Sequence, residues 1–372
     1  MKIIQLVPAL NSGGVERGTL EIARALVAAG HESVVISSGG RMVAQLEAEG
    51  TRHITLPIHK KALSSLWQIR PLRKIILQEH ADILHVRSRI PAWLTHFALR
   101  KIKIAARPVL ISTVHGFYSV NRYSEIMTRA DRVIAVSDSV VEYIRDNYPA
   151  CPIDSVTRIY RGINPDEFPH DYQPSNKWWQ TTLHDFPELE HKRWLTLPGR
   201  ITRLKGHESL FELVAKLKDK YPVHGVIVGD AHEKKQAYLT ELHAKVAELG
   251  LTEHITFVGH RSDIREWLAA SDIVLSLSAQ AETFGRTTLE AISVGTPVVG
   301  WNRGGVAEIL SQCFPQGLVE AGQETALLQT VDALLASPTT PAPVTQFQLS
   351  QMTNQTIGLY AEMVIKQKRT RT

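Results

Sequence analysis

Short apolar runs alternate with amphipathic segments along the first half of the chain. The first run, residues 2–9, is nearly continuous in apolar side chains, and residues 16–29 after it show helical spacing. Further runs of strand length lie at 33–38, 52–56, 83–87, 109–114, 132–136 and 155–160, with helical patterns at 42–49, 66–79, 92–100, 123–129 and 139–147 between them. Strands that alternate with helices in this way form a parallel sheet covered by helices.

A second series of the same kind begins near residue 194. Its apolar runs lie at 194–198, 223–228, 255–258, 273–277 and 297–300, and helical patterns lie at 207–218 and from about residue 285. Residues 165–193, between the two series, break the rhythm with four prolines. A chain of 372 residues is also too long for one ordinary core. We therefore predict an N-terminal α/β domain over residues 1–165, a connection with local elaboration over 166–193, and a second α/β domain over 194–349.

Composition is that of a globular protein, with 44% hydrophobic and 21% charged residues. The two cysteines, Cys151 and Cys313, form no Cys-x-x-Cys pair, which favours a reducing, cytoplasmic setting. The apolar run at the N-terminus is too short for a secretory signal. No stretch reaches the ~18 apolar residues that a membrane-spanning helix needs.

Positive charge is concentrated in one region. Residues 51–130 contain 14 Lys and Arg against three Asp and Glu, a net charge of +11 in a chain whose total is +5. Such asymmetry suggests an acidic partner, either anionic lipid or nucleic acid. Within this region, residues 66–77 and 93–103 interleave Trp, Leu and Ile with Arg and Lys, as segments at membrane interfaces do. The alternative is that both are ordinary sheet-covering helices with solvated charges.

Two glutamates eight positions apart, Glu282 and Glu290, mark the candidate chemistry of the second half. The pattern between them predicts a helix that begins near Gly285 or Arg286, with Glu282 before its N-terminus and Glu290 about one turn inside it. Free amides at such a helix start, including that of Phe284, donate to sugar or phosphate oxygens, and carboxylates accept from sugar hydroxyls. The alternative is that both glutamates are solvated helix residues.

Two basic residues, Arg200 and Lys205, lie between a predicted strand and the next helix. An Arg offers a planar fork and a Lys a mobile point charge, which together match a diphosphate without a metal. A solvated surface pair is the alternative. No Asp-x-Asp stands at a strand end to hold a metal in their place. His115 directly follows the strand predicted at 109–114, at the edge where parallel sheets bind ligands.

A glycine turn, Gly13-Gly14, joins the first predicted strand to the first helix and could cradle an anion. A dinucleotide fingerprint is disfavoured, because the spacing is Gly-Gly-x-x-x-Gly18 and not Gly-x-Gly-x-x-Gly. The second predicted strand also lacks the acidic residue at its end that would bind a ribose in that motif.

Glu282-x7-Glu290, followed by Gly-Thr-Pro-Val-Val at 295–299 and by Gly304-Gly305, resembles the donor-site signature of retaining GT-B glycosyltransferases of the GT4 type (group 1). The resemblance runs from Gly13-Gly14 to Gly304-Gly305 and is weak only at 165–193 and in the tail. It implies an α/β protein of GT-B architecture, in which two Rossmann-like parallel-sheet domains face each other across a cleft. It also implies that the last helix, within about 350–372, crosses back onto the first domain.

The resemblance further implies a hexosyltransferase-type enzyme and a role for each candidate residue. Glu290 would bind the ribose, Glu282 with the amides of Phe284 and Gly285 would hold the sugar, and His115 would face the reacting side of the sugar. Arg200, Lys205 and the turn at Gly13-Gly14 would meet the diphosphate, and the backbone of Gly259, His260 and Arg261 would line the base. The acceptor hydroxyl would attack from the front side while the leaving phosphate takes its proton, and no divalent metal cofactor is expected.

The expected donor is a nucleotide diphosphate sugar, with UDP favoured, and the expected acceptor is a lipid-linked, lipopolysaccharide-type or other polysaccharide hydroxyl. Arg87 and Arg89 would meet acidic groups of the acceptor while the protein docks on the inner face of the cytoplasmic membrane. A GT-B nucleotide-sugar 2-epimerase is the alternative; it would isomerise its nucleotide sugar without acceptor and needs extra carboxylates. A pyridoxal-bearing phosphorylase would need a much longer chain. A nucleic-acid-binding protein, the remaining alternative, would leave the glutamate pair unexplained, so no nucleic-acid partner is expected.

Overall fold

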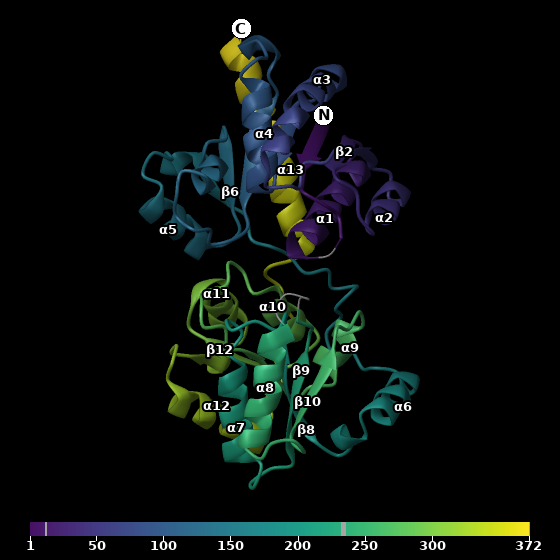
Figure 1. The fold of residues 1–372 in the computed structure, drawn as a ribbon, viewed down its shortest axis with the longest axis vertical. Coiled ribbons are helices and arrows are strands. Elements are labelled where there is room, and N and C mark those ends of the chain that lie inside the picture. Colours follow the sequence, from purple (N-terminus) through teal and green to yellow (C-terminus); the bar gives the residue numbers. More distant parts are fainter. Residues whose placement is uncertain (12, 232–235, 372) are drawn as a thin grey trace. The chain divides into compact units, whose positions relative to one another are not determined.

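The computed structural model describes residues 1–11, 13–231 and 236–371, and the chain divides into two compact units. Unit 1 comprises residues 1–162 together with the segment from residue 349 onward, and unit 2 comprises residues 163–348. Each unit contains one parallel sheet with helices packed on it (Figure 1). The predicted α/β class is therefore confirmed for both halves of the chain.

The sheet of unit 1 has seven strands in the order β3-β2-β1-β4-β5-β6-β7, and all of its neighbours are parallel. Its strands are β1 (Lys2–Leu6), β2 (Glu32–Ser37), β3 (Arg52–Thr55), β4 (Ile83–Val86), β5 (Val109–Val114), β6 (Arg132–Ala135) and β7 (Val156–Arg158). Each corresponds to one predicted apolar run. Because β4 and β5 are neighbours, the loops that carry Arg87 and His115 leave the same edge of the sheet.

Two separate apolar clusters cover the faces of this sheet. Its described helices are α1 (Gly14–Ala28), α2 (Val43–Ala48), α3 (Ile69–Glu79), α4 (Arg89–Leu99), α5 (Asp138–Asn147) and α13 (Leu349–Arg371). Side chains alternate between the faces, so Ile3 packs with α1 and α13 whereas Ile4 packs with α3, α4 and α5. Figure 1 shows α13 beside α1 in unit 1. In the part of the chain that the structure describes, no helix is long and apolar enough to cross a membrane.

Three predicted helices of unit 1 differ in detail, and two of the differences follow from proline. Residues 66–79, expected as one helix, form a short 3₁₀ helix η1 (Leu63–Gln68) and then α3. Pro71 lies in the first turn of α3, where its missing N–H is tolerated, and it could not continue an α-helix from residue 66. Pro91 has the same place in α4, which begins at Arg89 instead of residue 92. Residues 123–129 form only a 3₁₀ helix, η3 (Ser124–Thr128).

The sheet of unit 2 has six strands in the order β10-β9-β8-β11-β12-β13, again all parallel. Its strands are β8 (Arg193–Pro198), β9 (Val223–Val228), β10 (Ile255–Gly259), β11 (Ile273–Ser276), β12 (Val298–Trp301) and β13 (Leu318–Val319). Its described helices are α6 (Asn176–Asp185), α7 (His207–Leu217), α8 (Gln236–Glu248), α9 (Ile264–Ala269), α10 (Arg286–Ser293), α11 (Gly304–Cys313) and α12 (Glu324–Ala336). The two-residue strand β13 is too short to give a sequence pattern.

The proline-rich segment 166–193 is part of the body of unit 2, and not a loose connection. Ser175 caps α6, which carries Trp178 and Trp179 onto a cluster of buried indole rings. The Trp178 ring lies 5.3 Å from that of Trp267, and Trp267 stacks on Trp194 at 5.6 Å. Aromatic pairs at these separations stabilise a core beyond the area that they bury. The sequence expectation of a connection here is therefore replaced by a packed helix.

Candidate functional site

Three loops of unit 2 meet at the carboxyl edge of the sheet, because β8, β11 and β12 are neighbours. The backbone N–H of Ala279 donates to the carbonyl of Leu204 at 2.8 Å, which joins the loop after β11 to the loop after β8. Glu282 forms an isolated parallel bridge with Gly304, which joins the loop after β11 to the start of α11. These contacts bring Lys205, Glu282 and the Gly304-Gly305 turn to one place.

Glu282 is held by a lysine from the neighbouring loop and by a serine from its own loop. Lys205 Nζ lies 2.6 Å from Glu282 Oε1, and Ser278 Oγ donates to the same oxygen at 2.6 Å. The Glu282 side chain is 24% exposed. Burial raises the pKa of Glu282, but the Lys205 charge and the two hydrogen bonds outweigh it, so the pKa lies below its usual value. Glu282 is therefore an ionised acceptor at neutral pH, and its second oxygen suits a sugar hydroxyl.

Helix α10 starts at Arg286, four residues after Glu282, as the sequence predicts. Gly285 precedes it in the left-handed conformation with φ of 88°, so the chain turns sharply before the first helical residue, Arg286. A Cβ at Gly305 would clash with the backbone of Phe284, and the Gly305 N–H donates to the Glu282 carbonyl at 2.8 Å. Gly285 and the Gly304-Gly305 turn, both noted in the sequence, therefore have one structural cause. The start of α11 packs closely against residues 282–285.

Glu290 lies inside α10, in agreement with the sequence pattern, but it is almost entirely buried. Its side chain is 4% exposed, and Arg286 Nε lies 3.2 Å from Glu290 Oε1 across one helical turn. The carboxylate is therefore oriented by a neighbour on the same helix, a pair that the sequence analysis did not identify. A ribose hydroxyl that bound Glu290 would share the carboxylate with Arg286.

Of the remaining candidate site residues of unit 2, two have exposed side chains and one has a side chain that contacts other residues of the unit. Arg200 is exposed after β8, and His260 is exposed after β10. The Arg261 guanidinium lies 5.0 Å over the Trp267 ring and 3.5 Å from the Asp263 carboxylate, so that side chain belongs to the aromatic cluster. The expected role of the backbone of Gly259, His260 and Arg261 in lining the base stays a prediction. Among the described residues, no group of three or more His, Cys, Asp and Glu is arranged to hold a metal ion.

In unit 1, His115 follows β5 directly and contacts an arginine that the sequence analysis missed. Arg161 Nη2 lies 2.8 Å from His115 Nδ1. A guanidinium can only donate, so Nδ1 accepts and a neutral His115 ring carries its proton on Nε2. Burial and the positive charges of Arg161 and Arg87 hold the pKa of His115 well below its usual range. His115 is therefore a neutral donor at physiological pH.

Gly18 explains why Arg161 can reach this position. A Cβ at Gly18 would clash with the Arg161 guanidinium, so only glycine leaves room for it on the buried side of α1. Gly18 is the third glycine of the Gly-Gly-x-x-x-Gly spacing. It was the one sequence signal that could have indicated a close contact at this position. The spacing alone does not reveal that its partner is an arginine near the end of unit 1.

Arg87 does not lie where the sequence placed it. It is 3% exposed, and its Nη1 donates to Gln5 Oε1 at 2.7 Å inside unit 1. The Arg87 N–H still bonds the Leu6 carbonyl, so Arg87 continues the strand and its side chain shares a face with His85. That face is covered by α13, whose Tyr360 hydroxyl lies 2.6 Å from His85 Nδ1. Arg87 is therefore largely inaccessible to an acceptor in this structure, and the expected contact stays a prediction.

Arg89 and the glycine turn remain at the surface of unit 1. The Arg89 guanidinium lies 4.7 Å from the centre of the Tyr118 ring, and its Nη1 donates to Ser124 Oγ at 3.1 Å. At the glycine turn, α1 begins at Gly14 after Gly13, and a Cβ at Gly14 would meet nothing within 4 Å. The turn is therefore open to a ligand within unit 1; Ser12 lies outside the described residues.

Comparison with known proteins assigns the family. Residues 12–167 match the family model described as Glycosyltransferase Family 4, and residues 181–347 match that of the glycosyl transferases group 1. The chain is a GT-B glycosyltransferase of the GT4 type. It is thus an enzyme of the hexosyltransferase type, and the two matched regions together span most of this glycosyltransferase.

Three known proteins illustrate the similarity of this glycosyltransferase to its family. A crystal structure of a glycosyltransferase from Rickettsia africae superposes with a TM-score of 0.85 and 29% identity over 98% of both chains. The Anabaena protein HepE in complex with UDP has a TM-score of 0.74 and 22% identity over 100% of this chain and 98% of its own. The lipopolysaccharide core biosynthesis mannosyltransferase LpsB of Rhizobium meliloti is 30% identical over 57% of this chain and 54% of its own.

The neutral state of His115 makes a prediction about pH. We expect kcat/KM of this glycosyltransferase to show no inflection near pH 6.5, because the pKa of His115 lies well below that value and the ring stays neutral as pH falls through it. Arg161→Gln removes one positive charge beside the ring, so an inflection should move up into the measured range. Initial rates between pH 5 and 8 check this. A wild-type inflection at pH 6.5 that His115→Gln abolishes would contradict it.

Proposed function

We propose that this glycosyltransferase moves a sugar, with retention of configuration, from a UDP-sugar to a hydroxyl of a lipid-linked or lipopolysaccharide-type acceptor, without a bound metal. The observation that carries the proposal is the ionised Glu282 beside Lys205 at the start of α10. An anionic acceptor, a mobile cation and a helix N-terminus in one place suit the two ends of a sugar diphosphate. Glu282 takes sugar hydroxyls, and Lys205 takes the diphosphate.

Basic side chains and backbone amides of unit 2 can balance the negative charge of the departing diphosphate. Arg200 is exposed after β8, and Lys205 lies five residues later in the same loop. The amides at the start of α10 add a positive dipole end, so the developing charge meets oriented donors. These groups support transfer without a metal ion. In the reaction, the acceptor oxygen bonds to the anomeric carbon, the bond from that carbon to phosphate breaks, and the leaving phosphate oxygen takes the acceptor proton.

Glu282 fits this proposal as a binding group, and not as the base. Its pKa is below the usual value, and its Oε1 already accepts from Lys205 and Ser278. A weak base fixed in this way removes a proton poorly but holds a sugar well. In unit 1, a neutral His115 ring with its proton on Nε2 suits donation to a sugar oxygen, because it adds no positive charge.

Support for the nature of the two substrates comes from relatives. The structure of HepE was solved with UDP, which supports a UDP-sugar as donor here. LpsB is described as a mannosyltransferase of lipopolysaccharide core biosynthesis, which supports an acceptor of the same class. The basic region 51–130 of this chain is consistent with an acceptor that is anchored in an anionic membrane.

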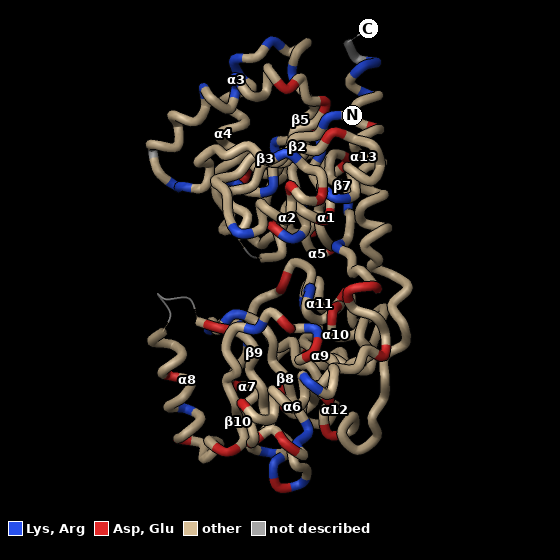
Figure 2. Tube along the Cα trace, turned by 90° about the vertical axis from the view of Figure 1, so that its right-hand side faces the viewer, with Lys and Arg blue, Asp and Glu red and all other residues tan. Residues whose placement is uncertain are grey.

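Part of that basic region is exposed and apolar, which supports docking of unit 1 on the membrane surface. Trp67 is 81% exposed, and Leu66 and Leu77 are also exposed. Figure 2 shows Lys and Arg recurring along the chain around α3. Leu72 and Ile76 on the other side of α3 are buried, so the helix both covers the sheet and presents a basic, partly apolar outer surface. An anionic membrane attracts such a surface by about 1 kcal/mol for each basic residue.

Vesicle binding tests the docking surface. We expect the protein to co-sediment with vesicles that contain anionic lipid, to be released at high salt, and to bind roughly 30-fold or more weakly after Arg70→Glu and Lys74→Glu, because two attractive charges become repulsive. Arg73 is left intact, since its Nε donates to the Ala98 carbonyl of α4. The matched control is Lys216→Glu with Lys245→Glu in unit 2. Equal sedimentation with neutral and anionic vesicles would favour a soluble acceptor.

The two glutamates should have separable roles, and this tests the donor site itself. Glu290→Gln should weaken UDP binding about 10- to 100-fold, the effect of losing one or two hydrogen bonds to a charged acceptor. Glu282→Gln should leave UDP affinity nearly unchanged and lower kcat. Calorimetric titration with UDP and initial rates measure the two effects, with Glu248→Gln as an exposed control. Equal UDP affinity of the wild type and a folded Glu290→Gln variant would refute the assignment.

A further inference from the structure

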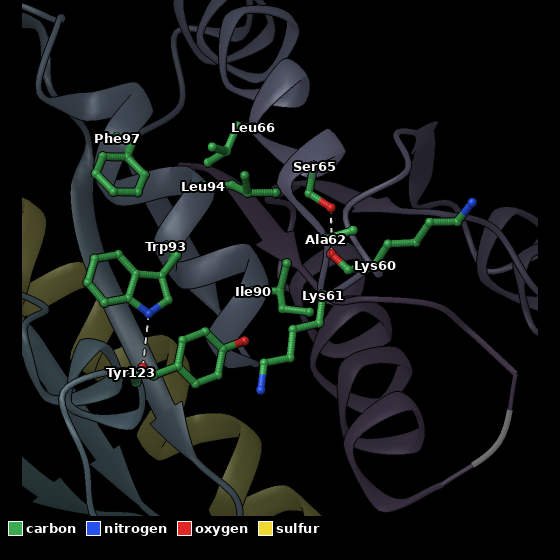
Figure 3. A pocket seen from close by; sticks show the side chains of 10 residues that line it. All are labelled: Lys60, Lys61, Ala62, Ser65, Leu66, Ile90, Trp93, Leu94, Phe97 and Tyr123. Carbon is green, nitrogen blue, oxygen red and sulfur yellow. Dashed lines mark hydrogen bonds between the residues drawn. The ribbon is translucent and has the colours of Figure 1, made fainter.

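Unit 1 contains an apolar cavity of about 390 Å³ between α4 and the segment that leads into α3. Ile90, Trp93, Leu94 and Phe97 of α4 line it, and Leu66 lies on the opposite side (Figure 3). The Trp93 and Phe97 rings stack at 5.6 Å. At about 30 Å³ for a group the size of a water molecule, the cavity has room for roughly a dozen methylene groups.

A row of contacting side chains, Tyr118, Arg89, Tyr123 and Trp93, connects this cavity to His115, and we call it the ladder. The Tyr118 hydroxyl accepts from the His115 backbone N–H at 3.4 Å, and the Arg89 guanidinium lies 4.7 Å from the centre of the Tyr118 ring and 5.4 Å from that of Tyr123. Tyr123 is nearly parallel to Trp93 at 6.5 Å. The Trp93 Nε1–H donates to the Tyr123 carbonyl at 2.9 Å, which fixes the indole ring. The cavity thus lies at one end of this row of side chains and His115 at the other.

Positive charge lies at the rim of the cavity. Lys61 Nζ is 4.9 Å from the centre of the Tyr123 ring, and the Arg89 guanidinium is 5.4 Å from the same centre. Figure 3 shows Lys61 reaching toward Tyr123, whereas the Lys60 side chain extends away from it. The described residues that line the cavity include no Asp or Glu. An apolar interior with cations at its mouth matches an amphiphile with a hydrocarbon chain and an anionic head.

We propose that this cavity binds the proximal hydrocarbon of a phosphorylated lipid, with the lipid phosphate at Lys61 and Arg89 and the acceptor sugar directed along the ladder toward His115. The inference rests on the proposed function, because it names the part of the lipid-linked acceptor that unit 1 recognises. It can be tested apart from docking on the membrane surface, because Arg70, Lys74 and the exposed Trp67 do not line the cavity, although Leu66 belongs to both surfaces.

Chain-length dependence of binding tests the proposal directly. The probes are butyl phosphate and octyl phosphate, used below the concentration at which octyl phosphate forms micelles, with inorganic phosphate as the third ligand. Each methylene buried in the cavity should tighten binding about fourfold, so octyl phosphate, with four more methylenes, should bind roughly 250-fold more tightly than butyl phosphate, with one site per chain. Calorimetry on the full chain gives both the affinity and the stoichiometry.

Three variants assign the binding to this cavity. Ala62→Trp fills it from an exposed rim position and should abolish the chain-length dependence, whereas Lys61→Glu should weaken all three phosphates and leave that dependence unchanged. The control is Lys103→Glu, because Lys103 is an exposed basic residue of the same unit that does not line the cavity. It should change neither the affinity for the phosphates nor its dependence on chain length. The Arg70→Glu and Lys74→Glu variant should also bind octyl phosphate normally.

UDP binding, measured in parallel, separates failure of the cavity assignment from failure of the proposed donor site. Equal affinities for butyl and octyl phosphate, or an unchanged chain-length dependence in Ala62→Trp, would overturn the cavity assignment even if UDP binds normally. Octyl phosphate binding with the predicted dependence would support the cavity. Failure of the wild type to bind UDP would instead refute the proposed donor site.

Discussion

The geometry of the donor site depends on the ion pair between Lys205 and Glu282. A carboxylate as buried as Glu282 is stable only if a cation and hydrogen-bond donors compensate its desolvation, and Lys205 and Ser278 do so from loops after adjacent strands. Removing either Lys205 or Glu282 would leave the other charge buried and uncompensated. The free-energy cost of that exceeds what the ion pair contributes to stability. The pair therefore holds the two loops together, and α10 starts four residues after Glu282 with its amides at the same edge of the sheet.

Local patterns were enough to predict the strands and the positions of several residues of the proposed donor site. Every predicted strand corresponds to one strand of the structure, because buried parallel strands are short, continuous apolar runs. The loops after parallel strands share one edge, so Lys205, Glu282 and His115 could each be placed at a ligand edge from their positions alone. The start of α10 was also predictable, since Gly285 and the periodic positions after it are local signals.

Features that depend on contacts between distant residues could not be predicted in this way. Arg87 has the same sequence context as an exposed loop residue, and its burial follows from Gln5 on another strand. Arg161 reaches His115 only because Gly18 leaves room for it, and the cavity in unit 1 forms only after the η1 segment packs beside α4. Segment 166–193 was also misjudged, because its prolines suggest a connection whereas its tryptophans pack on Trp194 and Trp267. In each case tertiary packing decided the outcome.

In the proposed function, protein cations and not a metal balance the diphosphate charge beside Glu282. The most direct test of this charge balance is the initial rate of transfer from a UDP-sugar by the wild type and by Lys205→Ala, each in EDTA and in Mg²⁺. The account predicts equal wild-type rates in both conditions and a loss of about 2–4 kcal/mol of transition-state stabilisation in Lys205→Ala, as for one lost electrostatic donor. Wild-type activity that disappears in EDTA and returns with Mg²⁺ or Mn²⁺ would contradict it.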